Sequence, residues 1–222
     1  MKIDTVVSFF SGYWIIEKKK SKLKETVQTE DLQKMRVIAG KCKSLPLKTV
    51  FGREIRPTTD RAKETLFNIL QPYLSNCRFL DLFGGSGGIG IEALSRGAAF
   101  CCFVEQNWRA AACIKENLQF TKLSEYALQL VADAREAVEQ LKNEEAFDII
   151  FMDPPYLKGM EQEVLKRLQG AHCVKDQTLF VIEASLKTNF SWLSHSDYEI
   201  IKEKKYKTNV HIFVRRTGGK KE

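Results

Sequence analysis

The most constraining feature of the sequence is an apolar run that breaks on a cluster of glycines and continues as an amphipathic segment. The run is Phe79–Phe83, five glycines lie between positions 84 and 90, and the amphipathic segment is Ile91–Arg96. Glycines let the backbone turn tightly and let a ligand reach main-chain N–H groups. Open parallel sheets bind ligands at the carboxyl ends of their strands. The stretch therefore predicts a ligand site at a strand-to-helix turn.

Two ligand classes fit this turn. Gly85–Gly90 matches G-x-G-x-x-G, which indicates a dinucleotide, although a single match of this kind has low specificity. Asp81, just before the glycines, favours S-adenosylmethionine instead, because a carboxylate suits a ligand with an ammonium group and repels a pyrophosphate. A turn that binds no ligand is the third possibility.

From residue 78 onward, apolar runs alternate with amphipathic segments, which is typical of a parallel sheet covered on both faces. The expected strands are Arg78–Phe83, Ala99–Val104, Ala127–Val131, Phe147–Met152 and Thr178–Ala184. The expected helices between them are Gly88–Arg96, Trp108–Phe120, Arg135–Lys142 and Gln162–Leu168. Tyr198–Lys205 and Val210–Arg215 are expected to close one edge of the sheet as an antiparallel hairpin. The pattern predicts an α/β fold.

Four successive predicted strands end near an acidic residue, namely Asp81, Glu105, Asp133 and Asp153. In a parallel sheet these ends face one crevice. We expect Asp81 near the amino-acid part of the cofactor and Glu105 on the ribose hydroxyls, where a carboxylate accepts two hydrogen bonds. Asp133 would accept from the adenine amine, beside the Ala134 N–H, and Asp153 would face the second substrate. A single carboxylate at a strand end is more often a helix cap, but four in succession favour the crevice.

The most specific short motif is Asp153-Pro154-Pro155-Tyr156. Two prolines make the loop rigid and leave carbonyl groups free to accept hydrogen bonds. A nucleobase amine that donates to the Asp153 carboxylate and the Pro154 carbonyl is held with its lone pair aimed at a methyl donor. Tyr156 offers a ring on which an extruded base stacks. An ordinary rigid turn is the alternative.

Residues Arg56–Leu70 predict a helix with Thr59 or Asp60 as its N-cap. Polar residues, Lys63 among them, crowd its start. Arg56 and Arg61 are interpreted as phosphate-binding residues whose geometry Asp60 and Glu64 fix. The equally weighted alternative is a solvated first turn with internal ion pairs.

The remaining N-terminal part divides in two. Met35–Lys41 and Leu45–Val50 are expected to form a hairpin. Residues 1–34 are expected to pack loosely. They are either a basic arm or, as we favour, an extension that results from the choice of an early start codon. The expected organisation is an extension (1–34), a hairpin and RNA-binding helix (35–77), a catalytic domain (78–216) and a tail (217–222).

The composition of the chain indicates its class of partner and its compartment. The chain has 222 residues and a net charge of +7, which favours a polyanionic partner. Its six cysteines form no C-x-x-C pair and it has three histidines, so no metal site is expected and a reducing cytoplasm fits best. The apolar run Val6–Ile16 is too short to span a bilayer.

Phe79–Gly87 together with Asp153–Tyr156 resembles the class I S-adenosylmethionine-dependent amino-methyltransferases. Met35–Gly40 and Arg56–Asn68 narrow the resemblance to the RsmD-type bacterial 16S rRNA (guanine-N2)-methyltransferases, from about Met35 to Arg216. Two departures are Gly84, where many relatives have alanine, and residues 1–34, which have no counterpart in compact members.

The resemblance implies a Rossmann-like, mostly parallel seven-stranded sheet and methylation of the 2-amino group of a loop guanine near the ribosomal P site. It also implies that the assembled small subunit is the preferred substrate, and we expect a monomer. The predicted RNA-binding residues are Arg36, Lys41, Arg56, Thr58, Asp60 and Arg61. The predicted cofactor-binding residues are Asp81, Phe83, Gly85, Gly87, Glu105, Asp133, Ala134 and Asp153. The predicted catalytic residues are Asp153, Pro154 and Tyr156.

Three rival functions are weaker. A DNA adenine-N6 methyltransferase also uses Asp-Pro-Pro-Tyr, but it usually needs a separate domain to read duplex sequence. A nicotinamide-dependent oxidoreductase explains the glycines and Glu105 but gives Asp153–Tyr156 no role. A non-catalytic RNA-binding protein does not need four carboxylates in one crevice.

Overall fold

The computed structural model describes residues 35–50 and 60–217 and the strands β1 (Val7–Phe10) and β2 (Tyr13–Ile16). The chain divides into two compact units, Met1–Leu32 and Gln33–Glu222. In the first, β1 and β2 pair antiparallel. The site described below lies in the second.

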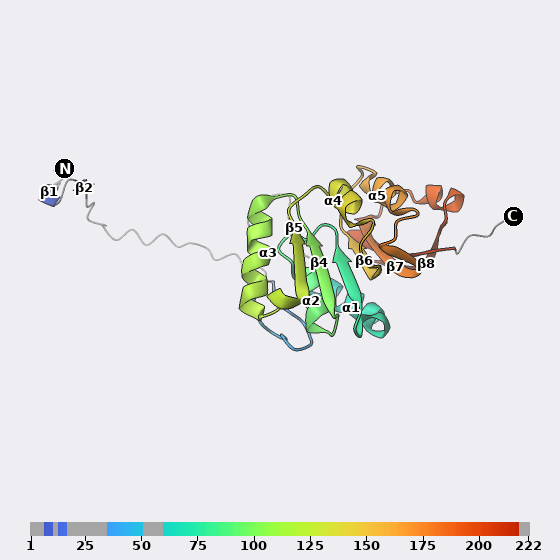
Figure 1. Ribbon diagram of the computed structural model, residues 1–222, viewed down its shortest axis with the longest axis horizontal. Coiled ribbons are helices and arrows are strands. Elements are labelled where there is room, and N and C mark those ends of the chain that lie inside the picture. The colour runs from blue at the N-terminus through green and yellow to red at the C-terminus, as the bar shows by residue number, and fades with distance from the viewer. Residues whose placement is uncertain (1–6, 11–12, 17–34, 51–59, 218–222) are drawn as a thin grey trace. The chain divides into compact units, whose positions relative to one another are not determined.

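In the second unit, the described residues form a seven-stranded sheet with the order β5-β4-β3-β6-β7-β9-β8 (Figure 1). The strands are β3 (Arg78–Asp81), β4 (Phe100–Val104), β5 (Ala127–Leu130), β6 (Phe147–Met152), β7 (Val174–Ser185), β8 (Tyr198–Lys205) and β9 (Asn209–Arg216). Strands β3 to β7 are parallel, and β9 runs antiparallel to β7 and β8. The predicted sheet and its C-terminal hairpin are confirmed.

Helices cover both faces of this sheet. They are α1 (Asp60–Leu74), α2 (Gly88–Ser95), α3 (Trp108–Thr121), α4 (Ala134–Leu141) and α5 (Met160–Leu168). Buried residues of α1, α2 and α3 share one core with Phe79 and Phe151, and those of α4 and α5 share another with Leu80 and Ile150. Because successive strand residues point to opposite faces, strands buried on both sides need the continuous apolar runs seen in the sequence.

The glycine cluster turns the chain from β3 into α2. Gly87 is the N-cap of α2 and has a φ of 84°, a left-handed conformation that favours glycine. A Cβ at Gly90 would lie 2.2 Å from the Phe103 side chain, so this glycine allows α2 to lie close against β4. The close packing brings the start of α2 to the tip of β3.

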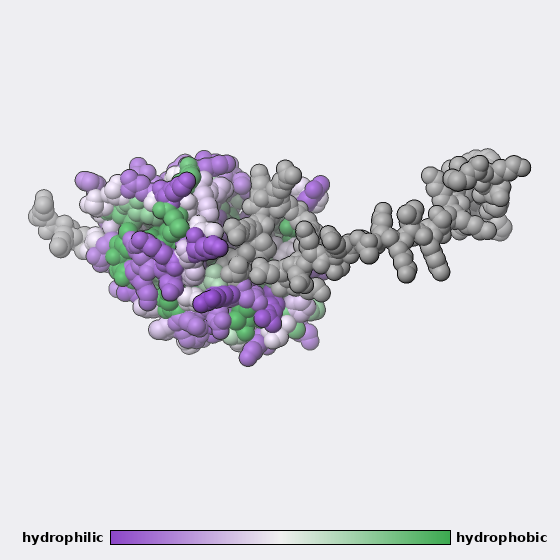
Figure 2. All heavy atoms as spheres, turned by 180° about the vertical axis from the view of Figure 1, so that it is seen from behind, coloured by the Kyte–Doolittle hydropathy of each residue, from purple (hydrophilic) through white to green (hydrophobic). Residues whose placement is uncertain are grey.

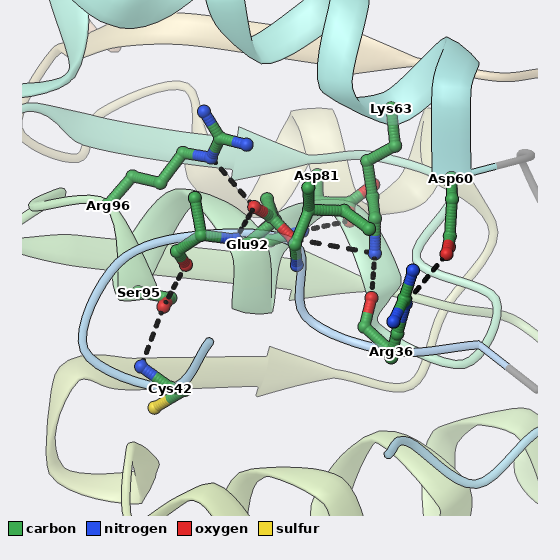
Figure 3. Close-up of polar contacts among 11 residues, drawn as sticks. Arg36, Cys42, Asp60, Lys63, Asp81, Glu92, Ser95 and Arg96 are labelled. Atoms are coloured by element: carbon green, nitrogen blue, oxygen red, sulfur yellow. Dashed lines mark hydrogen bonds and ion pairs between the residues drawn. The ribbon is translucent and has the colours of Figure 1, made fainter. Parts of the chain in front are cut away.

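The segment 35–50 forms the expected antiparallel pair only in part. One isolated bridge, Arg36 to Pro46, takes the place of two regular strands. The backbone instead bonds to the core, since the Ile38 and Ala39 N–H groups donate to the Glu92 carboxylate at 2.7 and 2.9 Å (Figure 3). These bonds fix the segment against α2.

Glu92 also joins α1 to α2. It is fully buried, accepts from Arg96 Nε at 2.7 Å, and lies 3.5 Å from the Lys63 ammonium (Figure 3). Lys63 donates its own hydrogen bond to the Arg36 carbonyl. The solvated first turn considered for this helix is therefore wrong at Lys63, which is 1% exposed.

Replacing Glu92 tests this junction. Glu92→Gln should lower the free energy of unfolding by about 3–5 kcal/mol, because it leaves a buried lysine without its counter-charge. Chemical denaturation measures the change. Glu139→Gln, which breaks an exposed pair with Lys142, is the control and should cost less than about 1 kcal/mol. Equal effects of the two changes would contradict the account.

Candidate functional site

The structure brings the four predicted carboxylates to one edge of the sheet. Asp133, Glu105, Asp81 and Asp153 follow or end the adjacent parallel strands β5, β4, β3 and β6, in that order. Asp81 interacts electrostatically with both Glu105 and Asp153. A cluster of carboxyl groups therefore lies at the carboxyl ends of the strands, and the role of each member stays a prediction.

Asp81 forms no ion pair with any described residue. It is 1% exposed, and its Oδ2 accepts from the Gly90 N–H at 3.1 Å. Its Oδ1 is buried and accepts no hydrogen bond from any described residue. Burial, the largest cause, and the charge of Glu105 together raise the pKa of Asp81 to about 7, although the backbone N–H groups of Gly90 and Phe83 lower it in part. An unpaired, buried carboxylate oxygen fits a ligand that carries an ammonium group and does not fit a phosphate.

Glu105 connects the glycine turn to α3. Its carboxylate accepts from the Gly85 N–H at 2.8 Å and from the Asn107 N–H at 2.7 Å. Asn107 in turn caps α3 by accepting from the Arg109 N–H. Glu105 therefore orders two loops of the crevice and keeps lone pairs for a ligand hydroxyl.

Asp133 is engaged differently from the expectation. It caps α4 by accepting from the Arg135 N–H at 2.9 Å and forms an ion pair with the Arg135 side chain at 2.8 Å. The hydrogen bond from Arg135 lowers the pKa of Asp133. Next to it, Ala134 is the buried first residue of α4. An adenine amine that donates to Asp133 has to share the carboxylate with Arg135. This contact stays a prediction.

The Asp153–Tyr156 loop follows β6 directly. Asp153 is half-buried, Pro154 is buried and Tyr156 is 43% exposed. Burial raises the pKa of Asp153 well above its usual range, and the negative charges of Glu183 and Asp81 raise it further. The loop thus combines a basic carboxylate with an accessible aromatic ring.

A buried network that the sequence reasoning missed supports this loop. Glu183 on β7 accepts from the Tyr156 hydroxyl at 2.9 Å and from Asn209 Nδ2 at 2.6 Å. Its other oxygen lies 3.0 Å from Nε2 of His211, whose Nδ1 lies 3.2 Å from the Tyr206 hydroxyl. The signal was present, because Glu183 and His211 are polar residues inside apolar strands and are register partners on β7 and β9.

The structure groups some of the predicted RNA-binding residues. Arg36 Nε contacts Asp60 Oδ2 at 2.8 Å, so Asp60 pairs with Arg36 among the described residues. Arg61 is exposed in the first turn of α1. Arg56 and Thr58 lie outside the described residues.

Lys41 is separated from this group. Its backbone N–H donates to the carbonyl of Ser95, the last residue of α2, and its ammonium lies 4.3 Å from the centre of the Tyr126 ring. Helix α2 begins at the crevice, at the carboxyl ends of the strands, and ends near their amino ends. Lys41 therefore lies away from the four carboxylates.

The described residues contain no group of three or more acidic, histidine or cysteine side chains that suits a metal ion. A search of the described helices found none long and apolar enough to cross a membrane. All six cysteines are buried and free.

Residues 35–215 match the family described as conserved hypothetical protein 95. The chain belongs to this family. This RsmD-type family includes the small subunit rRNA methyltransferase D of Haemophilus influenzae, which is 32% identical over 80% of this chain and 92% of its own. The Bacillus subtilis protein YlbH is 41% identical over 67% of this chain and 82% of its own.

Solved structures agree with the family assignment. The Escherichia coli protein yhhF superposes with a TM-score of 0.71 at 29% identity and covers 82% of this chain and 98% of its own. The Haemophilus influenzae protein HI0767 gives 0.70 at 30% identity with the same coverage. The fold is that of the class I methyltransferases, as the resemblance implied.

The unpaired carboxylate predicts an unusual dependence of stability on pH. Since the pKa of Asp81 rises from 3.8 to about 7 on folding, the folded state holds its proton more tightly than the unfolded state. Ionised Asp81 therefore destabilises the protein above pH 7, and the penalty disappears as the pH falls toward 4.

Asp81→Asn should remove that penalty. Its free energy of unfolding, relative to wild type, should rise between pH 4 and pH 8 by up to about 4 kcal/mol. Denaturation at a series of pH values measures the difference. A difference that does not change with pH would show that Asp81 has an ordinary pKa.

The charge of Glu183 is predicted to act on Asp153. Glu183→Gln removes a neighbouring negative charge, so the pKa of Asp153 should fall but stay above its usual range because burial remains. Carboxyl NMR titration measures it. Tyr156→Phe, which keeps the charge and loses one hydrogen bond, should have the smaller effect; a Glu183→Gln variant with an unshifted Asp153 would contradict the coupling.

Proposed function

We propose that the protein transfers a methyl group from S-adenosylmethionine to the exocyclic N2 of a guanine in the RNA of the small ribosomal subunit. The observation that carries the proposal is the pairing of two features at adjacent strand ends. Asp81 offers an unpaired carboxylate oxygen, and Asp153–Tyr156 offers a rigid acceptor loop. Relatives named rRNA small subunit methyltransferase D support RNA as the substrate.

Different residues of the crevice are proposed to bind different parts of the methyl donor. S-adenosylmethionine supplies an electrophilic methyl group on a sulfonium sulfur. Asp81 accepts from the ammonium group, Glu105 from the ribose hydroxyls, and Asp133 from the adenine amine beside Ala134. Phe83, Gly85 and Gly87 line the same turn. Four carboxylates suit a cationic ligand and oppose a dinucleotide phosphate.

The Asp153–Tyr156 loop is proposed to position the guanine that accepts the methyl group. The guanine amine donates one hydrogen bond to the Asp153 carboxylate and one to the Pro154 carbonyl, which aims its lone pair at the methyl carbon. The donor would supply the methyl carbon and leave as a neutral thioether, and Asp153 would take the proton that the guanine nitrogen loses. The raised pKa of Asp153 suits this transfer. Tyr156 stacks on the base while Glu183 holds its hydroxyl.

Arg36, Asp60 and Arg61, with Arg56 and Thr58, are proposed to contact RNA beside the crevice, and Lys41 to contact it elsewhere. We propose that the reaction takes place in the cytoplasm on the assembled small subunit, and that the protein acts as a monomer. A DNA adenine-N6 activity is not favoured, since relatives at 30–32% identity are named for rRNA.

Asp153→Ala separates catalysis from cofactor binding. It should lower the rate of methyl transfer by at least about 100-fold, because the amine loses its acceptor and its base. Radiolabelled methyl transfer to small subunits and calorimetry with S-adenosylmethionine measure the two effects. Asp176→Asn, at an exposed position of β7, is the control. Loss of cofactor binding in Asp153→Ala would overturn the role given to that carboxylate.

The position of the methyl group tests the substrate. Mass mapping of small-subunit rRNA from cells with and without the protein should locate it on N2 of one guanine. A methyl group on an adenine, or unchanged rRNA, would contradict the proposal.

A further inference from the structure

A groove with a volume of about 590 Å³ lies between α1 and the edge strand β8. Its apolar floor includes Phe213 of β9, and α1 contributes Asn68 and Tyr73 to one wall. Lys202 and Lys204 of β8 form the other wall. Figure 2, which views the molecule from behind, shows exposed hydrophobic surface among hydrophilic side chains on the side of the C-terminal strands.

The charge of this groove is uncompensated. Lys202 and Lys204 are exposed and form no ion pair with any described residue, and no acidic residue lines the groove. The described ion pair within β8 joins Lys205 to Glu203 instead. Two unpaired ammonium groups along one wall fit a polyanion.

The other wall suits a nucleobase. Tyr73 is 43% exposed, and the Arg215 guanidinium lies 5.4 Å from the centre of its ring. An exposed aromatic ring beside basic side chains is the combination with which proteins bind single-stranded nucleic acid. Asn68 adds an amide that donates to and accepts from base edges or 2′-hydroxyls.

Strand pairing links one wall of the groove to the candidate catalytic loop. Lys204 on β8 is the register partner of His211 on β9, and His211 is the partner of Glu183, which holds Tyr156. On the other wall, α1 begins at Asp60, beside Arg36 and the crevice, and runs to Tyr73. The wall formed by β8 is therefore linked to Tyr156 through strand pairing, and α1 links the other wall to the Arg36–Asp60 pair.

We propose that this groove binds a single-stranded segment of the substrate RNA, with its phosphates on Lys202 and Lys204 and a base on Tyr73, in the same strand as the nucleotide held at Tyr156. The proposal deepens the proposed function and rests on it. A protein strand added to the edge of β8 is the competing occupant, and exposed lysines on an edge strand disfavour it.

Salt dependence of RNA binding tests the two lysines. In Lys202→Gln/Lys204→Gln, the slope of log affinity against log salt concentration should fall by about 1.4, because each phosphate contact with a single strand contributes about 0.7. Fluorescence anisotropy with a labelled single-stranded RNA oligonucleotide measures it. Lys115→Gln/Lys166→Gln removes two exposed lysines on α3 and α5 and should leave the slope unchanged.

Tyr73→Ala tests the base contact. Loss of one stacked base should weaken RNA binding at least about fivefold at every salt concentration, without changing affinity for S-adenosylmethionine. Phe120→Ala, an exposed aromatic residue on α3, is the control. Equal effects of the two changes would overturn the assignment of Tyr73.

The outcomes separate this inference from the proposed function. Wild-type protein that binds RNA but transfers no methyl group would refute the function and leave the groove standing. An unchanged salt slope in an active double-lysine variant would refute the groove. If that variant binds RNA normally but loses binding to the small subunit, the occupant is protein, and the RNA assignment is overturned.

Discussion

The central constraint in this structure is a carboxylate that is buried without a counter-charge among the described residues. Asp81 ends the central strand β3, its Oδ1 accepts nothing from the described residues, and other carboxylates lie beside it. Such an arrangement opposes folding, since burial and like charges both disfavour ionisation. It persists because β3 is packed on both faces and the glycine turn fixes the start of α2. The site therefore holds a buried carboxylate whose ionisation a cationic ligand would favour.

A second buried carboxylate shows the contrast. Glu92 lies on α2, two residues after Gly90, and it is fully satisfied by Lys63, Arg96 and two backbone N–H groups. Its role is structural, because it holds the 35–50 segment and α1 against the core. The two buried carboxylates thus have different roles. Glu92, which is paired, positions the elements around the crevice, and Asp81, which has no counter-charge among the described residues, leaves the crevice suited to a cation.

Much of the fold was predictable because it depends on local patterns. Apolar runs marked the parallel strands of the main sheet, and glycines marked the ligand turn. Contacts between distant residues were not predictable in the same way. Lys63 sits among polar residues in the sequence, yet α1 packs so that its ammonium meets Glu92. Glu183 and His211 are 28 positions apart and become partners only through the antiparallel pairing of β7 and β9. Asp133 shows the limit of spacing arguments, since spacing predicted its place at the sheet edge but not its ion pair with Arg135.

Calorimetry with S-adenosylmethionine tests the central claim most directly. At pH 6, titrations in two buffers with different enthalpies of ionisation should show binding with release of about one proton, because Asp81 is mostly protonated below a pKa of about 7 and must ionise to hold a cation. Absence of binding, or binding without proton release, would contradict the account.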